Sequence, residues 1–497
     1  MITFLICLAL LVAAYFVYGK YLEKVCGISM VHKVPSESKF DGVDYVPMPM
    51  WKTFFIQLLN IAGLGPIFGA VSGAAYGPVA FLWITFGGIL FGAMHDFVAG
   101  VMSLREGGMS LPDIIKRYLG RGMGWFNLVF TVGLMVLVGA VFMSQPAALM
   151  AGWLPESASA WLNEMTGGAT INGFSTPIIC MMAIILVYYI IATLFPVDKI
   201  IGKIYPVFGF ALVAMAVGIL GVLLFAGKYT IPELDFVNHI ADPSKFPIFP
   251  TLFITIACGA ISGFHATQSP IMARCLTNEK ECRPVFYGAM ISESIIALIW
   301  AAIAMAFFGS VEGLNTELYT NGKAAAVLVD EIANETLGRW IAYLVMFGVV
   351  GAAITSGDTA FRSARLMIAD AFGIEQRTLW KRVAVCLPIF ALALFIILAT
   401  DSQTLWRYFA WFNQTLSVFT LWAICIFLVR RGKPVVIAML PAIWMTYICS
   451  SFLFTGQQML HLSPVLGNIL AGVLTLLITL YFIYVFNSEA RNAKTQA

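Results

Sequence analysis

The sequence predicts an all-α membrane protein that crosses the bilayer about thirteen times. Composition, the spacing of apolar runs and the placement of lysine and arginine carry this prediction. Of 497 residues, 60% are apolar and 11% are charged, which is typical of a polytopic membrane protein. The formal net charge of +3 is too small to indicate a nucleic-acid partner.

Apolar runs of about 20 residues mark the membrane-spanning helices, because this length crosses the hydrocarbon core. Lys20 and Lys24 follow the first run and no basic residue precedes it, so we predict a retained helix, not a secretory signal. The predicted spans are 2–19, 54–75, 79–104, 125–151, 175–195, 203–226, 249–273, 285–309, 337–365, 382–399, 405–429, 434–455 and 463–486.

Lysine and arginine in the connections predict the orientation. One set of alternate connections, beginning with 20–53, holds 24 of these residues, and the other set holds 5. Basic residues gather in cytoplasmic loops, so we place the N-terminus outside and the C-terminus in the cytoplasm of a cell (inner) membrane protein. One span missed or added in mid-chain would destroy this asymmetry.

The predicted span at 249–273 contains an unusual polar stretch, Ile256–Pro270. It holds two glycines, a histidine, a glutamine, three hydroxyls and a proline. Irregular backbone at membrane depth is tolerated only where protein or a water-filled cavity satisfies it. We expect the helix to break here and line a binding site; the alternative is close packing through small residues.

The span at 54–75 has the same character in Asn60–Pro66, and Gly63 lies 196 residues before Gly259. Five helices separate the starts of the two broken spans, so the two halves have opposite orientations. Paired breaks in inverted halves favour a transporter binding site. The expected parts are 1–53, an extra helix and loop; 54–226 and 227–430, the two repeats; and 431–497, two further helices and a tail.

This arrangement resembles the leucine-transporter fold, in which five plus five inverted helices each begin with an unwound helix. Three connections are predicted from their own residues to be structured: a short cytoplasmic helix in 105–121, a lid in the outer loop 310–336 and a cytoplasmic helix at 371–381. They match the connecting segments that the resemblance implies. In the first, Ser110 is the expected cap and Gly120 the stop, while Lys323–Thr336 is the helical run of the lid. Segments 152–174 and 227–248 read as polar connections.

Three motifs resemble the carbon starvation protein A (CstA) family. They are Ile61-Ala62-Gly63-Leu64-Gly65-Pro66, Gly92-Ala93-Met94-His95-Asp96-Phe97-Val98, and Ile254 through His265. The resemblance covers most of 50–430. It implies an inner-membrane transporter that takes up peptides or pyruvate during nutrient limitation, as part of a stress response.

A small carboxylate suits paired breaks, because broken half-helices direct amide N–H groups and positive dipole ends at a mid-membrane anion. Glycines would allow close backbone approach, and polar side chains would bond the substrate. An alternative for His265 is a bond within the bundle. The substrate-binding candidates are Gly63, Gly65, Pro66, Ser262, Gly263, His265, Gln268 and Ser269.

Ionisable residues inside the membrane are candidates for ion or proton coupling, because burying charge there is costly. The candidates are His95, Asp96, Glu293 and Asp358. Asp358 and Arg362 are spaced i,i+4, so an ion pair is an equal alternative for that carboxylate.

Sodium is the rival coupling ion, and no other metal or cofactor is expected. The leucine-transporter resemblance implies a Na⁺ site from the carbonyls of Leu59, Ala62 and Ala352 with the hydroxyls of Thr355 and Ser356. The alternative is two hydroxyls bonded to their own helix.

The function predicted is a secondary active transporter that imports a small carboxylate or short peptides with H⁺ or Na⁺ by alternating access. A channel and a nutrient-sensing receptor are the alternatives. An enzyme is disfavoured, because no nucleophile, phosphate-loop or metal motif is evident and the nine cysteines are scattered. We read these cysteines, and the amides Asn413 and Gln414, as packing residues. The oligomeric state is not predicted.

Overall fold

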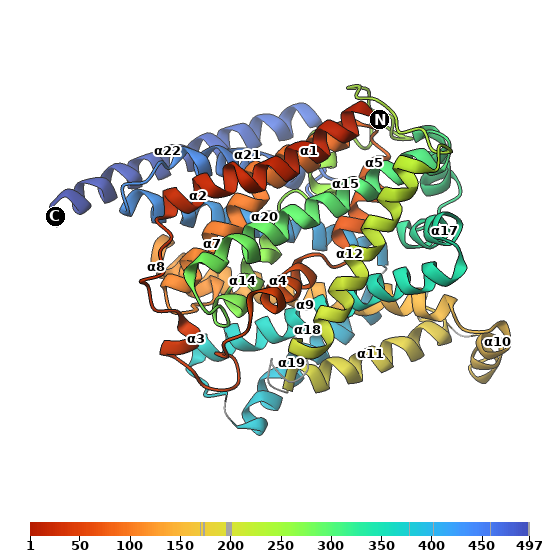
Figure 1. The fold of residues 1–497 in the computed structure, drawn as a ribbon, viewed down its shortest axis with the longest axis horizontal. Helices are drawn as coiled ribbons and strands as arrows, with labels where there is room; N and C mark the ends of the chain where they lie inside the picture. Colours follow the sequence, from red (N-terminus) through yellow and green to blue (C-terminus); the bar gives the residue numbers. More distant parts are fainter. Residues whose placement is uncertain are drawn as a thin grey trace.

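The computed structural model describes residues 1–168, 170–171, 174–194, 201–376, 378–400, 402–457 and 459–495. Across these ranges the chain is a bundle of helices without a β-strand, and the long helices run roughly side by side (Figure 1). The predicted all-α membrane class is therefore confirmed. Lys199 and Arg377, two of the loop charges, lie outside the described residues.

Each predicted span coincides with helix, although most helices extend a few residues further. Two spans are interrupted, and short π-helical segments (η1, η2, η3 and η5) lie within four of them. The elements are α1 Ile2–Phe16 and α2 Tyr18–Cys26; α4 Met50–Ile61, η1 Gly65–Gly69 and α5 Ala70–Ala74; α6 Val79–Leu82, η2 Trp83–Ala93 and α7 Met94–Arg105; α9 Arg121–Gly152; α11 Thr176–Leu194; α12 Ile201–Phe225; η3 Ile248–Leu252, α13 Phe253–Thr255 and α14 Gly263–Ala273; η5 Arg283–Gly288 and α15 Ala289–Phe307; α18 Arg339–Phe372; α19 Leu379–Ala399; α20 Ser402–Arg430; α21 Val436–Thr455; and α22 Pro464–Thr495.

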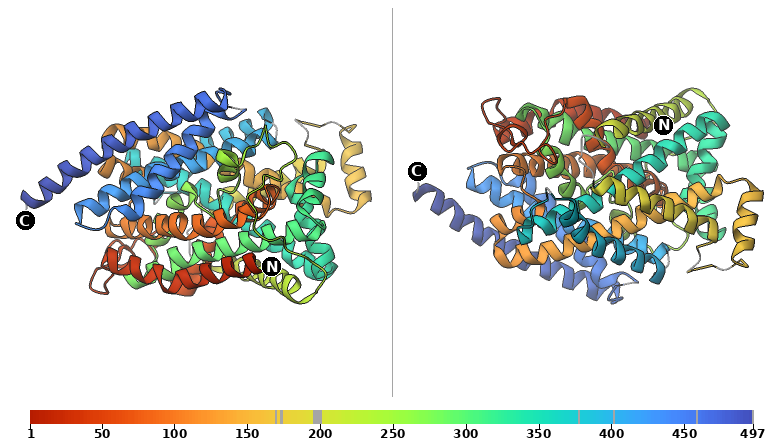
Figure 2. Two further views of the ribbon diagram at one scale, coloured as in Figure 1. Left: turned by 90° about the horizontal axis from the view of Figure 1, so that it is seen from above. Right: turned by 90° about the horizontal axis from the view of Figure 1, so that it is seen from below.

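Among the described residues, nine helices are long and apolar enough to cross a membrane, or ten if the bent pair formed by α4 with η1 and α5 is one span. The count of thirteen therefore stays a prediction. In both views of Figure 2 the far end of α22 projects at the left, and the N-terminus lies right of the middle of the bundle.

Both expected breaks are present. In the first, α4 ends at Ile61 and the chain resumes as η1 with a bend of 53°. In the second, α13 ends at Thr255 and α14 begins at Gly263. Gly259 within this second break has φ +90°, a left-handed conformation that a residue with a Cβ adopts only at a cost.

The two broken helices pack against each other, so their breaks are neighbours. A Cβ on Gly65 would lie 2.3 Å from the Cys258 sulfur, and one on Gly73 would lie 2.2 Å from Ile256. A Cβ on Gly69, which lies between these two glycines, would be 3.2 Å from the Thr255 carbonyl oxygen. Glycine every fourth residue thus allows one half-helix to lie directly on the other break.

The connections gather at two ends of the bundle. We call one the basic end: Lys39 donates to the Gly107 carbonyl (2.9 Å), Arg274 donates to the Gly108 carbonyl (2.8 Å), and Arg105 contacts Glu279 at 2.6 Å. We call the other the distal end. There the Met1 amine contacts Glu233 at 2.7 Å, and the N-terminus lies on the right of Figure 1.

Two connecting helices are confirmed. The first is α8, Leu111–Leu119, which begins after Ser110 and ends at Gly120, with Leu111, Ile114 and Ile115 buried as an amphipathic pattern predicts. The second is α17, Ala325–Leu337, the expected run of the lid. Two shorter segments precede it, α16 Val311–Asn315 and η6 Thr316–Thr320.

The structure corrects two predictions about connections. The expected helix at 371–381 is absent from its described residues: α18 continues to Phe372 and ends at Gly373, which has φ +64°. Arg365 then donates to the Gln376 side chain at 3.0 Å. This bond fixes the described residues after Gly373 in a non-helical conformation before α19 begins at Leu379. Segment 152–174 is also more than a polar connection, because α10 forms over Glu156–Met165 with an acidic first turn.

His239 fixes the connection 226–247 to the distal end. Its ring nitrogens contact Asp235 at 3.0 Å and Glu312 at 3.1 Å, and its backbone N–H donates to the Tyr76 carbonyl. Burial favours the neutral ring, but the hydrogen bonds to Asp235 and Glu312 outweigh it and raise the pKa of His239 above its usual range.

We predict that His239 makes stability depend on pH. A raised pKa means that the protonated ring stabilises the fold; this contribution is complete below the unfolded pKa of about 6.5 and is lost as pH rises through the raised pKa. Thermal unfolding in detergent should show the wild type losing more stability than His239→Gln between pH ~6 and pH ~8.5. Equal losses in the two proteins would contradict this.

Candidate functional site

A chain of four buried ionisable residues lies beside the second break. Asp96 bonds to two histidines, through His95 Nδ1 at 2.8 Å and His265 Nδ1 at 2.8 Å. The other nitrogen of His265, Nε2, lies 3.4 Å from Glu293 Oε2. All four side chains are completely buried. We call these four residues the relay.

The break itself brings the relay together. His265 is the third residue of α14, so it sits in the first turn after the interruption. Asp96 is the third residue of α7, and this helix approaches closely because Gly92 precedes it: a Cβ there would lie 2.2 Å from the Ala260 carbonyl oxygen. Glu293 comes from α15.

The relay joins the two predicted repeats. His95 and Asp96 belong to 54–226, whereas His265 and Glu293 belong to 227–430. The structure thus places three proton-coupling candidates with one substrate-binding candidate. The fourth proton-coupling candidate, Asp358, bonds instead to Tyr205, whose hydroxyl donates to it at 2.7 Å.

The hydrogen bonds of the relay fix its chemistry. An ionised Asp96 is only an acceptor, so each histidine must donate Nδ1–H to it. Nε2 of a neutral His265 then carries a lone pair and faces Glu293, so one proton can reside on either group. Nε2 of His95, at the other end, has no hydrogen-bond partner among the described residues.

Cys258, which the sequence analysis reads as a packing residue, is buried beside the relay. Its sulfur and single donor atoms of His265 and Glu293 all lie within 4.8 Å of one another. The side-chain amide of Asn413 also lies 3.7 Å from this sulfur. The sequence separates Cys258 from Glu293, and only the fold around the break brings them together.

The polar groups that the second break frees are satisfied from neighbouring helices. The Asn413 side-chain oxygen accepts from the Ser262 hydroxyl (2.9 Å) and from the Phe264 N–H (2.7 Å). Gln414 donates to the Phe253 carbonyl at 3.1 Å, and Trp83 donates to the Ile256 carbonyl at 2.9 Å. Asn413 and Gln414 were predicted as general packing residues, but they hold the ends of both half-helices.

Several substrate-binding candidates contact other protein groups. Ser262 bonds to Asn413, and Ser269 donates to the His265 carbonyl at 3.0 Å. Gln268 donates to the Thr267 hydroxyl at 2.8 Å, while its side-chain oxygen has no partner among the described residues. Gln268 is therefore the candidate with a polar atom left for a ligand.

The candidate glycines also have packing roles. A Cβ on Gly263 would lie 2.4 Å from the Ser417 nitrogen, and one on Gly63 would lie 2.6 Å from the Phe142 ring. Gly65 packs on Cys258, and Pro66 is buried within η1. Their role in binding stays a prediction.

The proposed sodium ligands lie in two hydrogen-bonded pairs. The Ser356 hydroxyl donates to the Leu59 carbonyl at 2.6 Å, and the Thr355 hydroxyl donates to the Ala352 carbonyl at 3.0 Å. These hard oxygens suit sodium in type, and α18 does meet α4 at the first break. Each carbonyl and each hydroxyl oxygen in these pairs keeps a lone pair that a cation could use, so the Na⁺ site stays a prediction. Ala62, the remaining candidate, is buried at the break.

Two buried amides on α4, just before the first break, belong to the polar stretch seen in the sequence but are not among the predicted site residues. Gln57 and Asn60 are fully buried on α4, and neither side-chain oxygen nor nitrogen has a hydrogen-bond partner among the described residues. A buried polar group without a partner costs about 1–3 kcal/mol. Gln57 and Asn60 are three residues apart and lie on one face of α4, so a ligand or water that bonds both is one explanation of these unpartnered groups.

Comparison with known proteins places this fold and site in a family. The profile of the family described as carbon starvation protein CstA matches residues 1–176 and 148–338. The chain belongs to the carbon starvation protein CstA family. The resemblance drawn from the three sequence motifs is thereby confirmed.

Relatives within the CstA family cover much of the chain. The Haemophilus influenzae protein named "Uncharacterized membrane protein" is 43% identical over 63% of this chain and 93% of its own. The Escherichia coli peptide transporter CstA is 25% identical over 88% of this chain and 78% of its own. The Escherichia coli pyruvate/proton symporter BtsT is 27% identical over 58% of this chain and 46% of its own.

A solved structure confirms the fold. MhsT, crystallised with L-phenylalanine, superposes with a TM-score of 0.52 and 16% identity, covering 86% of this chain and 98% of that one. This similarity shows that the CstA family member has a leucine-transporter-like fold.

We predict that Asn413→Ala destabilises this CstA family member. The substitution leaves the Ser262 hydroxyl and the Phe264 N–H without an acceptor, and each buried unpaired group costs about 1–3 kcal/mol. Thermal unfolding in detergent should show a clear decrease relative to Asn163→Ala, a matched control on α10. An unchanged unfolding temperature would show that Asn413 does not hold the break.

Proposed function

We propose that this protein is a proton-coupled secondary transporter that imports a small carboxylate by alternating access, with the distal end outside. The observation that carries the proposal is the buried relay between the two repeats. A proton added to or removed from a fully buried cluster changes its charge at high cost. Protonation would therefore favour one arrangement of the repeats over the other.

The relay also offers a route for the proton. His95 Nε2 is available at one end, Asp96 holds both imidazole rings, and His265 and Glu293 share a site at the other end. When the repeats separate, His265 and Glu293 would each meet water and release or accept a proton there. We therefore assign His265 to proton coupling, although it was first a substrate-binding candidate.

The substrate class rests on chemistry and on similarity. Gln57, Asn60 and Gln268 carry buried polar atoms that could bond the oxygens of a small molecule. The symporter BtsT is named for pyruvate and protons, whereas the CstA relatives are named for peptides. We choose the small carboxylate because the N–H groups of broken half-helices suit a small anion. Sodium remains the alternative coupling ion, and we propose the proton because the relay consists of groups that can gain or lose one.

Uptake by proteoliposomes tests the proposal. Labelled pyruvate and a labelled dipeptide are offered under an imposed proton gradient and then under a sodium gradient. We expect pyruvate to accumulate with the proton gradient only. Entry without accumulation would indicate a channel, and binding without entry would indicate a receptor; either outcome would overturn the proposal.

We predict that His265→Gln abolishes this accumulation. Glutamine can still donate to Asp96, but it cannot exchange a proton with Glu293. The control is Thr420→Val, which removes a buried hydroxyl bonded only to its own helix. If His265→Gln accumulates pyruvate under a proton gradient as well as Thr420→Val does, the relay does not carry the coupling proton.

A further inference from the structure

Two adjoining cavities lie at the distal end, in front of the breaks. Their volumes are ≈ 370 and ≈ 440 Å³. We call the pair the vestibule. The residues that line both cavities are Ser72, Lys245, Phe246, Tyr319, Trp406 and Arg407.

The vestibule leads toward the transport site. Ser72 belongs to α5, the outer half of the first broken helix, and Thr255 is the last helical residue before the second break and lines the first cavity. Tyr319 comes from the lid segment η6, and Trp406 comes from the start of α20. A solute entering from this end meets the vestibule before either break.

The vestibule is cationic. Arg407 and Lys245 line both cavities, and the described lining of both contains no aspartate or glutamate. Lys323, at the second cavity, contacts two carboxylates, Glu317 (2.8 Å) and Glu331 (2.7 Å), so it adds no net positive charge to the vestibule.

The two principal cations are differently placed. The described residues offer Arg407 no carboxylate within ion-pair distance, and the Lys245 ammonium lies 5.4 Å from the Phe246 ring centroid. The nearby Asp242 is engaged by the Ser244 hydroxyl at 2.6 Å and the Lys245 backbone N–H at 3.1 Å. The guanidinium of Arg407 thus retains its paired donors for a planar anion.

We propose that the vestibule is a capture site for small carboxylates, ahead of the transport site. Arg407 binds the carboxylate through two parallel N–H···O bonds, Lys245 adds charge, and Trp406 and Tyr319 flank the ligand. A cleft lined by one sign of charge raises the local concentration of the opposite ion. The inference deepens the proposed function and rests on it for the identity of the substrate.

Quenching of Trp406 fluorescence tests the site without any transport. The fluorescence of Trp406 is obtained by subtracting the emission of Trp406→Phe from the emission of the wild type. Iodide, an anion, should quench it more than acrylamide does, and pyruvate should protect it from iodide. Arg407→Gln should reduce quenching by iodide and leave quenching by acrylamide unchanged. If iodide quenches Trp406 equally in the wild type and in Arg407→Gln, the proposal of a capture site is overturned.

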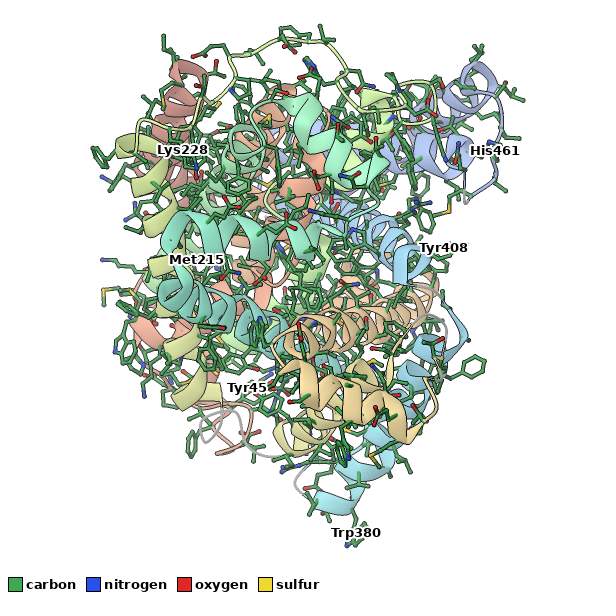
Figure 3. All side chains as sticks on the ribbon, turned by 90° about the vertical axis from the view of Figure 1, so that its right-hand side faces the viewer. Tyr45, Met215, Lys228, Trp380, Tyr408 and His461 are labelled. Atoms are coloured by element: carbon green, nitrogen blue, oxygen red, sulfur yellow. The ribbon has the colours of Figure 1, made fainter. Side chains whose placement is uncertain are left out.

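Transport kinetics provide the second readout. Arg407→Gln should raise the KM for pyruvate about tenfold with the maximal rate retained, and Arg407→Lys should restore part of the loss. Lys228→Gln is the matched control, because Lys228 lies across the distal end from His461, which lines the first cavity (Figure 3). An unchanged KM in Arg407→Gln would also overturn the capture site. Failure of the wild type to transport pyruvate would overturn the proposed function and leave the quenching result standing.

Discussion

Asp96 is fully buried and accepts hydrogen bonds from His95 and His265. A carboxylate in this position is tolerated only because both partners donate hydrogen bonds to it. One of them is its neighbour on α7, and the other stands in the first turn after the second break. The position of α14 against α7 and the orientation of His265 toward Glu293 depend on this interaction.

The same constraint explains the surroundings of the breaks. A helix interrupted at membrane depth exposes carbonyl and N–H groups that lipid cannot satisfy. Asn413, Gln414 and Trp83 bond those groups at the second break, and Ser356 bonds the Leu59 carbonyl at the first. Glycines at 65 and 73 then let the two irregular segments pack directly. Irregular backbone is thus fixed by specific partners, as a site that must keep its geometry requires.

Composition and periodicity predicted the helices, both breaks, α8 and α17, because these depend on local apolar patterns and on glycine and proline. The contacts that make the site could not be predicted in this way. Asp96 and His265 are 169 residues apart, and nothing local distinguishes Asn413 as the residue that caps α14. The helix expected at 371–381 failed because Gly373 and the Arg365–Gln376 bond override a locally favourable pattern.

The central claim is that protonation of the relay drives the exchange between the two arrangements of the repeats. Its most direct test compares substrate exchange with driven accumulation in Glu293→Gln. Exchange across proteoliposomes requires the loaded carrier to reorient but requires no net proton movement. The account predicts that Glu293→Gln retains exchange of pyruvate and loses accumulation under a proton gradient. Accumulation equal to the wild type, or loss of exchange together with accumulation in a correctly folded protein, would contradict it.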